Sequence, residues 1–184
     1  MEYIQEIEGQ VGQLKNVSKE IRKKIRLGKL DEAYRLTAQY PNDLIIMSQR
    51  CTILIKQGRL EEAKIIGKQF EDDPIIQSQM VTIAIQEGDI ERANAIGAKF
   101  ESNEAIQSQM ITIAIQEGRL EDAKAIGEKF QDNPMIQNQM ITIAIQEGRL
   151  EEAKAIGARF KKYEPIQRQI MTIAILHLFY YNKV

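Results

Sequence analysis

One unit of 30 residues is written several times in this chain, and glycines mark its period. They lie 30 residues apart, at Gly28, Gly58, Gly88, Gly118 and Gly148. Segments 74–103, 104–133 and 134–163 are near-identical copies of the unit. A fixed period of this size is typical of arrays in which each unit is too small to bury its apolar face alone and stacks on its neighbours. The repeat therefore predicts a solenoid.

Each copy predicts two helices joined by a tight turn. In the copy 74–103 the first helix runs from Pro74 to Glu87, with Asp73 as its N-cap and Gly88 as its end. The same pattern makes Asn133 the N-cap of the helix that begins at Pro134. A main apolar stripe follows the first helix at Ile76, Met80, Ile83 and Ala84. The second helix buries Ile90, Ala93, Ile96, Gly97 and Phe100, and its two small residues allow a neighbouring helix to approach closely.

The turn and second helix resemble the tetratricopeptide class of helical repeats. The resemblance rests on a turn glycine, a leucine two residues later, two acidic residues and a packing alanine, here Gly148, Leu150, Glu151, Glu152 and Ala153. It implies an all-α fold, a right-handed α-solenoid of stacked helix-turn-helix repeats (TPR-like) with the repeat shortened to 30 residues, whose first helices line a groove.

We expect an N-terminal helical extension over 1–13 and a single solenoid domain over 14–184. Within that domain we expect about five hairpins and a C-terminal capping helix, with these bounds: 14–43, 44–73, 74–103, 104–133, 134–163 and 164–184.

Residues able to carry catalysis are scarce. The 184 residues include one histidine and one cysteine, His177 and Cys51, and no Gly-rich phosphate loop or metal-spaced cluster. We expect no enzyme, no cofactor and no metal. The single cysteine, together with an acidic N-terminus without a signal pattern and apolar runs too short to span a bilayer, predicts a cytoplasmic protein that does not enter the membrane.

Polar side chains recur on one face of the first helices. They stand three and four residues apart in each copy, so stacking turns them into a ladder. We take the ladder as the candidate partner-binding surface, and its members are Gln49, Thr52, Lys56, Gln79, Thr82, Gln86, Gln109, Thr112, Gln116, Gln139, Thr142 and Gln146. An alternative interpretation is that these side chains only solvate the groove or bond between adjacent repeats.

The ladder becomes basic at its N-terminal end. Its first members there are Lys19, Arg22 and Arg26, and residues 15–29 hold seven basic side chains against Glu20 alone. The whole chain has a net charge of −1, so this is a local charge that favours an anionic partner. We therefore predict a non-catalytic scaffold that binds an acidic protein or peptide.

Single-stranded nucleic acid is the alternative partner. Helical repeats can read one base each through a few side chains, and Ser48, Ser78, Ser108 and Asn138 recur near the starts of first helices. No aromatic residue recurs at an exposed position where it could stack on bases, and the near-neutral charge is unfavourable for phosphate binding. The protein partner is the preferred hypothesis.

The two ends of the chain differ from the regular copies. Residues 2–27 have heptad-like apolar spacing interrupted by Gly9 and Gly12, which predicts a long helix or a helix pair, either a cap or a dimerising coiled coil. The C-terminal helix carries an apolar tail. It either covers the last hairpin or pairs two chains or docks a partner through Leu178, Phe179, Tyr180 and Tyr181. A homodimer through either end is possible from the sequence.

Overall fold

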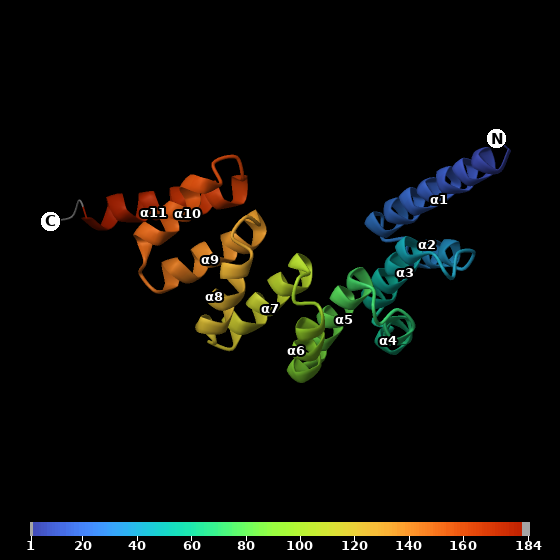
Figure 1. Ribbon diagram of the computed structural model, residues 1–184, viewed down its shortest axis with the longest axis horizontal. Helices are drawn as coiled ribbons and strands as arrows, with labels where there is room; N and C mark the ends of the chain where they lie inside the picture. Colours follow the sequence, from blue (N-terminus) through green and yellow to red (C-terminus); the bar gives the residue numbers. More distant parts are fainter. Residues whose placement is uncertain (1, 182–184) are drawn as a thin grey trace. The chain divides into compact units, whose positions relative to one another are not determined.

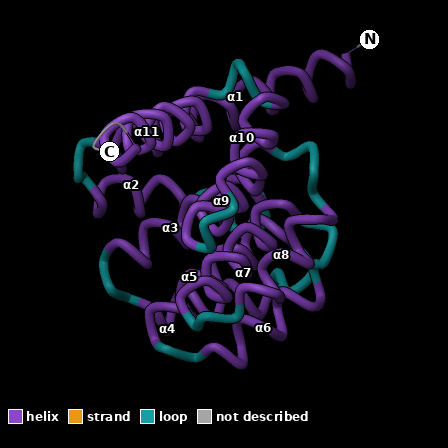
Figure 2. Tube along the Cα trace, turned by 90° about the vertical axis from the view of Figure 1, so that its left-hand side faces the viewer, coloured by secondary structure: helices purple, strands orange, loops and turns teal. Residues whose placement is uncertain are grey.

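In the computed structural model, the backbone is described for residues 2–181 and the side chains for residues 11–175. This part of the chain is all helical, with short loops and no strand (Figure 2). The helices in chain order are α1 (Glu2–Arg26), α2 (Leu30–Thr37), α3 (Leu44–Lys56), α4 (Leu60–Gln69), α5 (Pro74–Glu87), α6 (Ile90–Lys99), α7 (Glu104–Gln116), α8 (Leu120–Lys129), α9 (Pro134–Gln146), α10 (Leu150–Arg159) and α11 (Glu164–Tyr181). The expected all-α fold is confirmed.

The chain divides into two compact units, Met1–Asp89 and Ile90–Val184. In the first unit α3 contacts α1 on one side and α5 on the other, while α2 contacts both α1 and α3, and α4 contacts both α3 and α5 (Figure 1). In the second unit α9 likewise lies between α7 and α11, and α8 contacts both α7 and α9. Within each unit, therefore, first helices pack on first helices, and second helices fill the angles between them.

Local sequence signals set the helix ends. The side chains of Asp73 and Asn133 accept hydrogen bonds from the backbone N–H groups of Ile76 and Ile136, at 2.9 and 3.0 Å. Gly88 ends α5 with φ at 72°, a left-handed conformation that other residues adopt only with strain. The predicted caps and the predicted bounds of α5 are confirmed.

The apolar stripe of the first helices forms the core. Ile76, Met80, Ile83 and Ala84 are at most 1% exposed. The small residues of the second helices permit close packing, as predicted: a Cβ atom added at Gly97 would lie 2.7 Å from Met110 Cγ. The repeated phenylalanines are only partly buried, because each stands at the end of its second helix, as Phe130 does after α8.

Helix α1 is one unbroken helix of 25 residues. It runs through Gly9 and Gly12 and across the expected boundary between 13 and 14. Its C-terminal half is anchored by Ile21, which is fully buried in a cluster with Ala33, Ile46 and Ile53. Among the described residues, no helix combines the length and apolar character needed to cross a membrane.

Cys51 lies in the core of α3 with no exposed surface. Burial raises the pKa of its thiol to about 12. We expect iodoacetamide at pH 8.5 to label the native protein at least about a hundredfold more slowly than the urea-unfolded chain, because the thiolate is the reactive form. Mass spectrometry of the labelled chain measures both rates. Equal rates in the two states would contradict the burial of this thiol.

Candidate functional site

In the first unit, the glutamine that begins each ladder set bonds to the preceding first helix. Gln79 Nε2 donates to Ser48 O at 3.0 Å, to Ser48 Oγ at 3.2 Å and to Thr52 Oγ1 at 3.1 Å. Gln49 Nε2 reaches Ser18 O and Oγ at 3.1 and 2.7 Å in the same way. These amide groups therefore tie α1 to α3 and α3 to α5.

The second unit repeats this arrangement. Gln139 Nε2 donates to Ser108 O at 3.0 Å and to Thr112 Oγ1 at 2.9 Å, and Gln169 Nε2 donates to Thr142 Oγ1 at 3.2 Å. Gln109 is partly buried on α7. The ladder glutamines with these contacts therefore form hydrogen bonds between adjacent repeats, as in the alternative interpretation.

The remaining ladder positions differ in exposure. Thr52, Thr82, Thr112 and Thr142 each donate their hydroxyl to the backbone carbonyl four residues earlier. The last member of each set is exposed, and these members are Lys56, Gln86, Gln116 and Gln146. The side chains that a partner can reach directly are therefore Thr112, the last members of each set and the exposed basic residues of α1.

Those basic residues line a cleft between α1 and α3. The cleft has a volume of about 660 Å³, and its walls are Lys19, Arg22, Ile25, Arg26, Gln49 and Thr52. We call this set of six residues the basic cleft. All six come from the first unit, and five of them were predicted site residues. Gln49 is 8% exposed, so it forms the floor and the cations form the rim.

No described carboxylate neutralises the rim cations of the basic cleft. Among the described side chains, Lys19, Arg22 and Arg26 have no carboxylate at ion-pair distance, and all three are exposed. The neighbouring Lys24 instead pairs with Glu32 at 2.7 Å and with Glu20 at 3.7 Å. The Lys24 hydrogen bond lowers the pKa of Glu32 below its ordinary value. Lys24 is thus paired with carboxylates, whereas the cleft side of α1 keeps its positive charge.

Two further cations lie against the aromatic ring of Tyr34 on α2, and neither lines the basic cleft. The guanidinium carbons of Arg50 and Arg59 lie 4.2 and 4.5 Å from the centre of the Tyr34 ring. Arg50 also donates to the Tyr34 hydroxyl at 2.5 Å, and Arg59 pairs with Glu62 at 2.6 Å. Sequence reasoning did not find this stack, because its members come from α2, α3 and the loop before α4.

A smaller hollow continues the basic cleft toward the N-terminal end of α3. It has a volume of about 270 Å³, and its walls are Val11, Leu14, Lys15, Ser18, Arg22, Asp43 and Ile45. We call it the apolar hollow. Val11 is 43% exposed and Ile45 59% exposed. Arg22 lines both spaces, so one continuous surface along α1 is apolar at one end and basic at the other.

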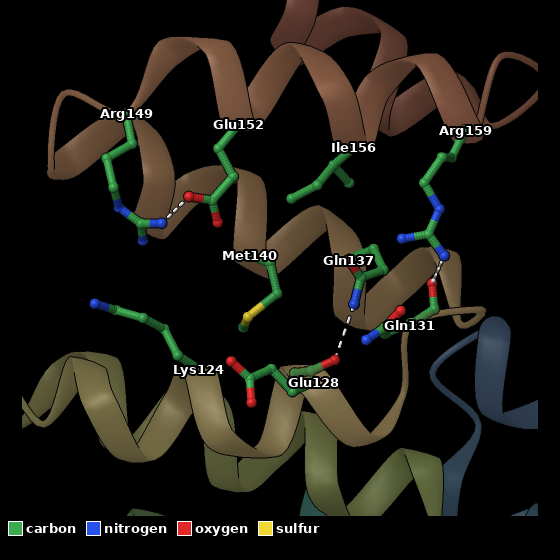
Figure 3. A pocket seen from close by; sticks show the side chains of 10 residues that line it. Lys124, Glu128, Gln131, Gln137, Met140, Arg149, Glu152, Ile156 and Arg159 are labelled. Carbon is green, nitrogen blue, oxygen red and sulfur yellow. Dashed lines mark hydrogen bonds and ion pairs between the residues drawn. The ribbon is translucent and has the colours of Figure 1, made fainter.

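A second set of buried glutamines was missed by sequence reasoning. Gln137 Nε2 donates to Gly127 O at 3.0 Å and to Phe130 O at 3.3 Å, which fixes the end of α8 to the start of α9 (Figure 3). Gln77, Gln107 and Gln167 make the same pair of bonds in their own copies. The signal was available: a glutamine recurs directly after a fully buried isoleucine, at Ile136 and its equivalents.

The space drawn in Figure 3 is a crevice of about 270 Å³ in the second unit. Met140 and Gln137 of α9 line it between α8 and α10, and Arg159 reaches across to donate to Gln131 O at 2.9 Å. Arg149 pairs with Glu152, and Lys124 pairs with Glu147 at 2.9 Å. Its cations Lys124, Arg149 and Arg159 thus have carboxylate partners, unlike the rim cations of the basic cleft.

Two of the positions considered for base reading, Ser48 and Ser108, form hydrogen bonds within the fold. Ser48 accepts the Gln79 amide, and Ser108 is 9% exposed and donates to Gln139 Oε1 at 3.1 Å. The predicted self-association residues Leu178, Phe179, Tyr180 and Tyr181 lie outside the residues whose side chains the structure describes. No family model, curated protein or solved structure matches this chain.

Proposed function

We propose that this protein is a non-catalytic scaffold that binds an acidic protein or peptide in the basic cleft. The carrying observation is that Lys19, Arg22 and Arg26 line a cleft of about 660 Å³ without a carboxylate partner among the described side chains. Exposed cations held on one helix attract acidic groups, and arginine binds a carboxylate through two parallel hydrogen bonds.

The proposal includes a tetratricopeptide-like architecture. The contacts that repeat within each unit, first helix on first helix with the second helices in the angles between them, support a right-handed solenoid of stacked hairpins. The single, buried cysteine supports a reducing, cytosolic location. Under this proposal the ladder glutamines hold the repeats in register, and the cleft provides the recognition.

Reversal of three charges tests the proposal. We expect the Lys19→Glu, Arg22→Glu, Arg26→Glu variant to bind a fluorescent poly-glutamate peptide about threefold to a hundredfold more weakly than the wild type, because three lost ion pairs at about 0.2 to 1 kcal/mol each sum to about 0.6 to 3 kcal/mol. Fluorescence anisotropy in 0.05 M NaCl measures the affinity. The matched control is Lys68→Glu, Lys161→Glu, Lys162→Glu, which changes the net charge equally at exposed positions that do not line the cleft.

Two results would remove the proposal. One is equal affinity of the cleft variant and the control variant for the acidic peptide. The other is a natural partner that nuclease removes when the protein is co-purified from its native host with and without nuclease. That result, together with binding of labelled poly(U) by the cleft in solution, would favour single-stranded nucleic acid as the partner.

A further inference from the structure

Helix α1 is divided into an acidic half and a basic half. Residues 2–14 contain Glu2, Glu6 and Glu8 and no lysine or arginine, whereas residues 15–29 contain seven basic side chains and one acid. The helix dipole favours acids at the start and bases at the end of a helix, but its effect is confined to the first and last turns. It therefore does not account for Glu6, Glu8, Lys15 or Lys19.

Acids such as Glu61 and Glu121 on the second helices have a basic residue one turn away, whereas the acids of the α1 acidic half have none in their own stretch of sequence. Glu61 pairs with Lys64 at 2.7 Å, and Glu121 pairs with Lys124 at 2.5 Å, each within one turn. A helical residue reaches others three or four positions away, and no basic residue occurs before Lys15. The acidic half thus complements the basic cleft in charge, and it cannot fold back on its own helix.

The two halves also match in length. Residues 2–13 and 15–26 each span about 18 Å of helix. The basic half borders α3, with the basic cleft and the apolar hollow between them, while the acidic half extends beyond α2 (Figure 1). At the junction, a Cβ atom added at Gly12 would meet nothing within 4 Å, and Val11 is 43% exposed. A second chain can therefore approach α1 closely at Val11 and Gly12.

We propose that the basic cleft is occupied by the acidic half of α1 from a second copy of this chain. The two α1 helices run antiparallel and cross near Leu14, so each copy places its acidic half along the other copy's basic half. One twofold axis makes the contact twice, as in other isologous dimers. Val11 and Ile45, which are exposed at the apolar hollow, lie where the crossing covers them. The inference rests on the proposed function, since it names the acidic partner of the same cleft.

The test measures mass in solution with light scattering after size exclusion, on the full chain. We expect the wild type at 20 μM in 0.05 M NaCl to have about twice its 21.1 kDa chain mass, and to become a monomer in 1 M NaCl because salt screens exposed ion pairs. Two variants should be monomers even at low salt: Glu2→Lys, Glu6→Lys, Glu8→Lys in the acidic half, and Lys19→Glu, Arg22→Glu, Arg26→Glu in the cleft.

A mixture of the acidic-half variant and the cleft variant provides the decisive test of the dimer. An equimolar mixture should form a mixed dimer, because each variant then meets a half of opposite charge on both sides of the twofold axis. The Lys68→Glu, Lys161→Glu, Lys162→Glu control should dimerise like the wild type. Circular dichroism of each variant checks that its helices remain, and if the cleft variant loses them, the acidic-half variant and the salt series decide alone.

The outcomes separate the dimer from the proposed function. A wild type that stays monomeric at low salt, or variants that stay monomeric after mixing while both remain helical, overturns the dimer. In either case binding of poly-glutamate through the cleft leaves the proposed function standing. Failure of both the dimer and the peptide binding removes both proposals. A dimer that the acidic peptide dissociates supports both at once.

Discussion

Replacing Gly127 with leucine should destabilise the second unit by about 1 to 3 kcal/mol. Gly127 lies on α8 against Met140 of α9, and a Cβ atom placed there would be 2.7 Å from Met140 Cγ. Both residues line the crevice of Figure 3, where the methionine occupies the space that a larger residue would need. Urea denaturation followed by circular dichroism measures the loss.

Truncating the opposing side chain should reverse part of that loss. In the Gly127→Leu, Met140→Ala double variant the leucine enters the volume that the methionine leaves, so the two changes should couple by at least about 0.5 kcal/mol in a double-mutant cycle. Ala125→Leu, an exposed change on the same helix, is the control and should shift stability by less than about 0.5 kcal/mol. Additive effects would show that α8 and α9 do not meet at Gly127.

Features set by neighbours in the sequence could be predicted. Asp73, Pro74 and Gly88 specify the two ends of α5 through one cap bond, one fixed dihedral angle and one left-handed residue, all of which act within a few positions. The apolar stripe was equally predictable, because helical spacing places Ile76, Met80 and Ile83 on one side wherever the partner helix lies.

The roles of the glutamines could not be predicted in the same way. Gln77 and Gln79 differ by two positions, and both stand on a helix with apolar residues on two flanks. One bonds the preceding second helix at Gly67, and the other bonds the preceding first helix at Ser48, 31 residues away. Helical spacing states which residues share a face, and it does not state which neighbouring helix that face meets.

The basic cleft could be predicted in part. Its charge could be predicted from the sequence, since Lys19, Arg22 and Arg26 follow one face of α1. The absence of a neutralising carboxylate among the described side chains depends on where α2 lies, because Glu32 of α2 pairs with Lys24 and Lys29 and not with the rim cations. The number of cations available to a partner is therefore a tertiary property.

Replacing Gln137 with glutamate should be among the most damaging single changes in the second unit. Gln137 is 4% exposed, and its amide nitrogen faces Gly127 O and Phe130 O. A carboxylate there would be a buried charge facing two carbonyl oxygens, which costs about 3 to 5 kcal/mol. Gln137→Met removes the same donors without adding charge and should cost about 1 to 2 kcal/mol, because both carbonyls also accept backbone N–H groups.

The difference between these two variants should depend on pH with a defined sign. Burial among oxygen atoms raises the folded-state pKa of the new carboxyl group above its unfolded value of about 4.3. The Gln137→Glu protein should therefore be least stable relative to Gln137→Met at neutral pH, gain stability as the pH falls through the folded-state pKa, and level off below about 4.3. Gln146→Glu, an exposed change on α9, should stay within about 1 kcal/mol of the wild type. Urea denaturation of the three variants at pH 7, 5 and 4 measures these differences in stability. If the stability of Gln137→Glu relative to Gln137→Met is the same at all three pH values, the side chain at this position is not enclosed between α8 and α9.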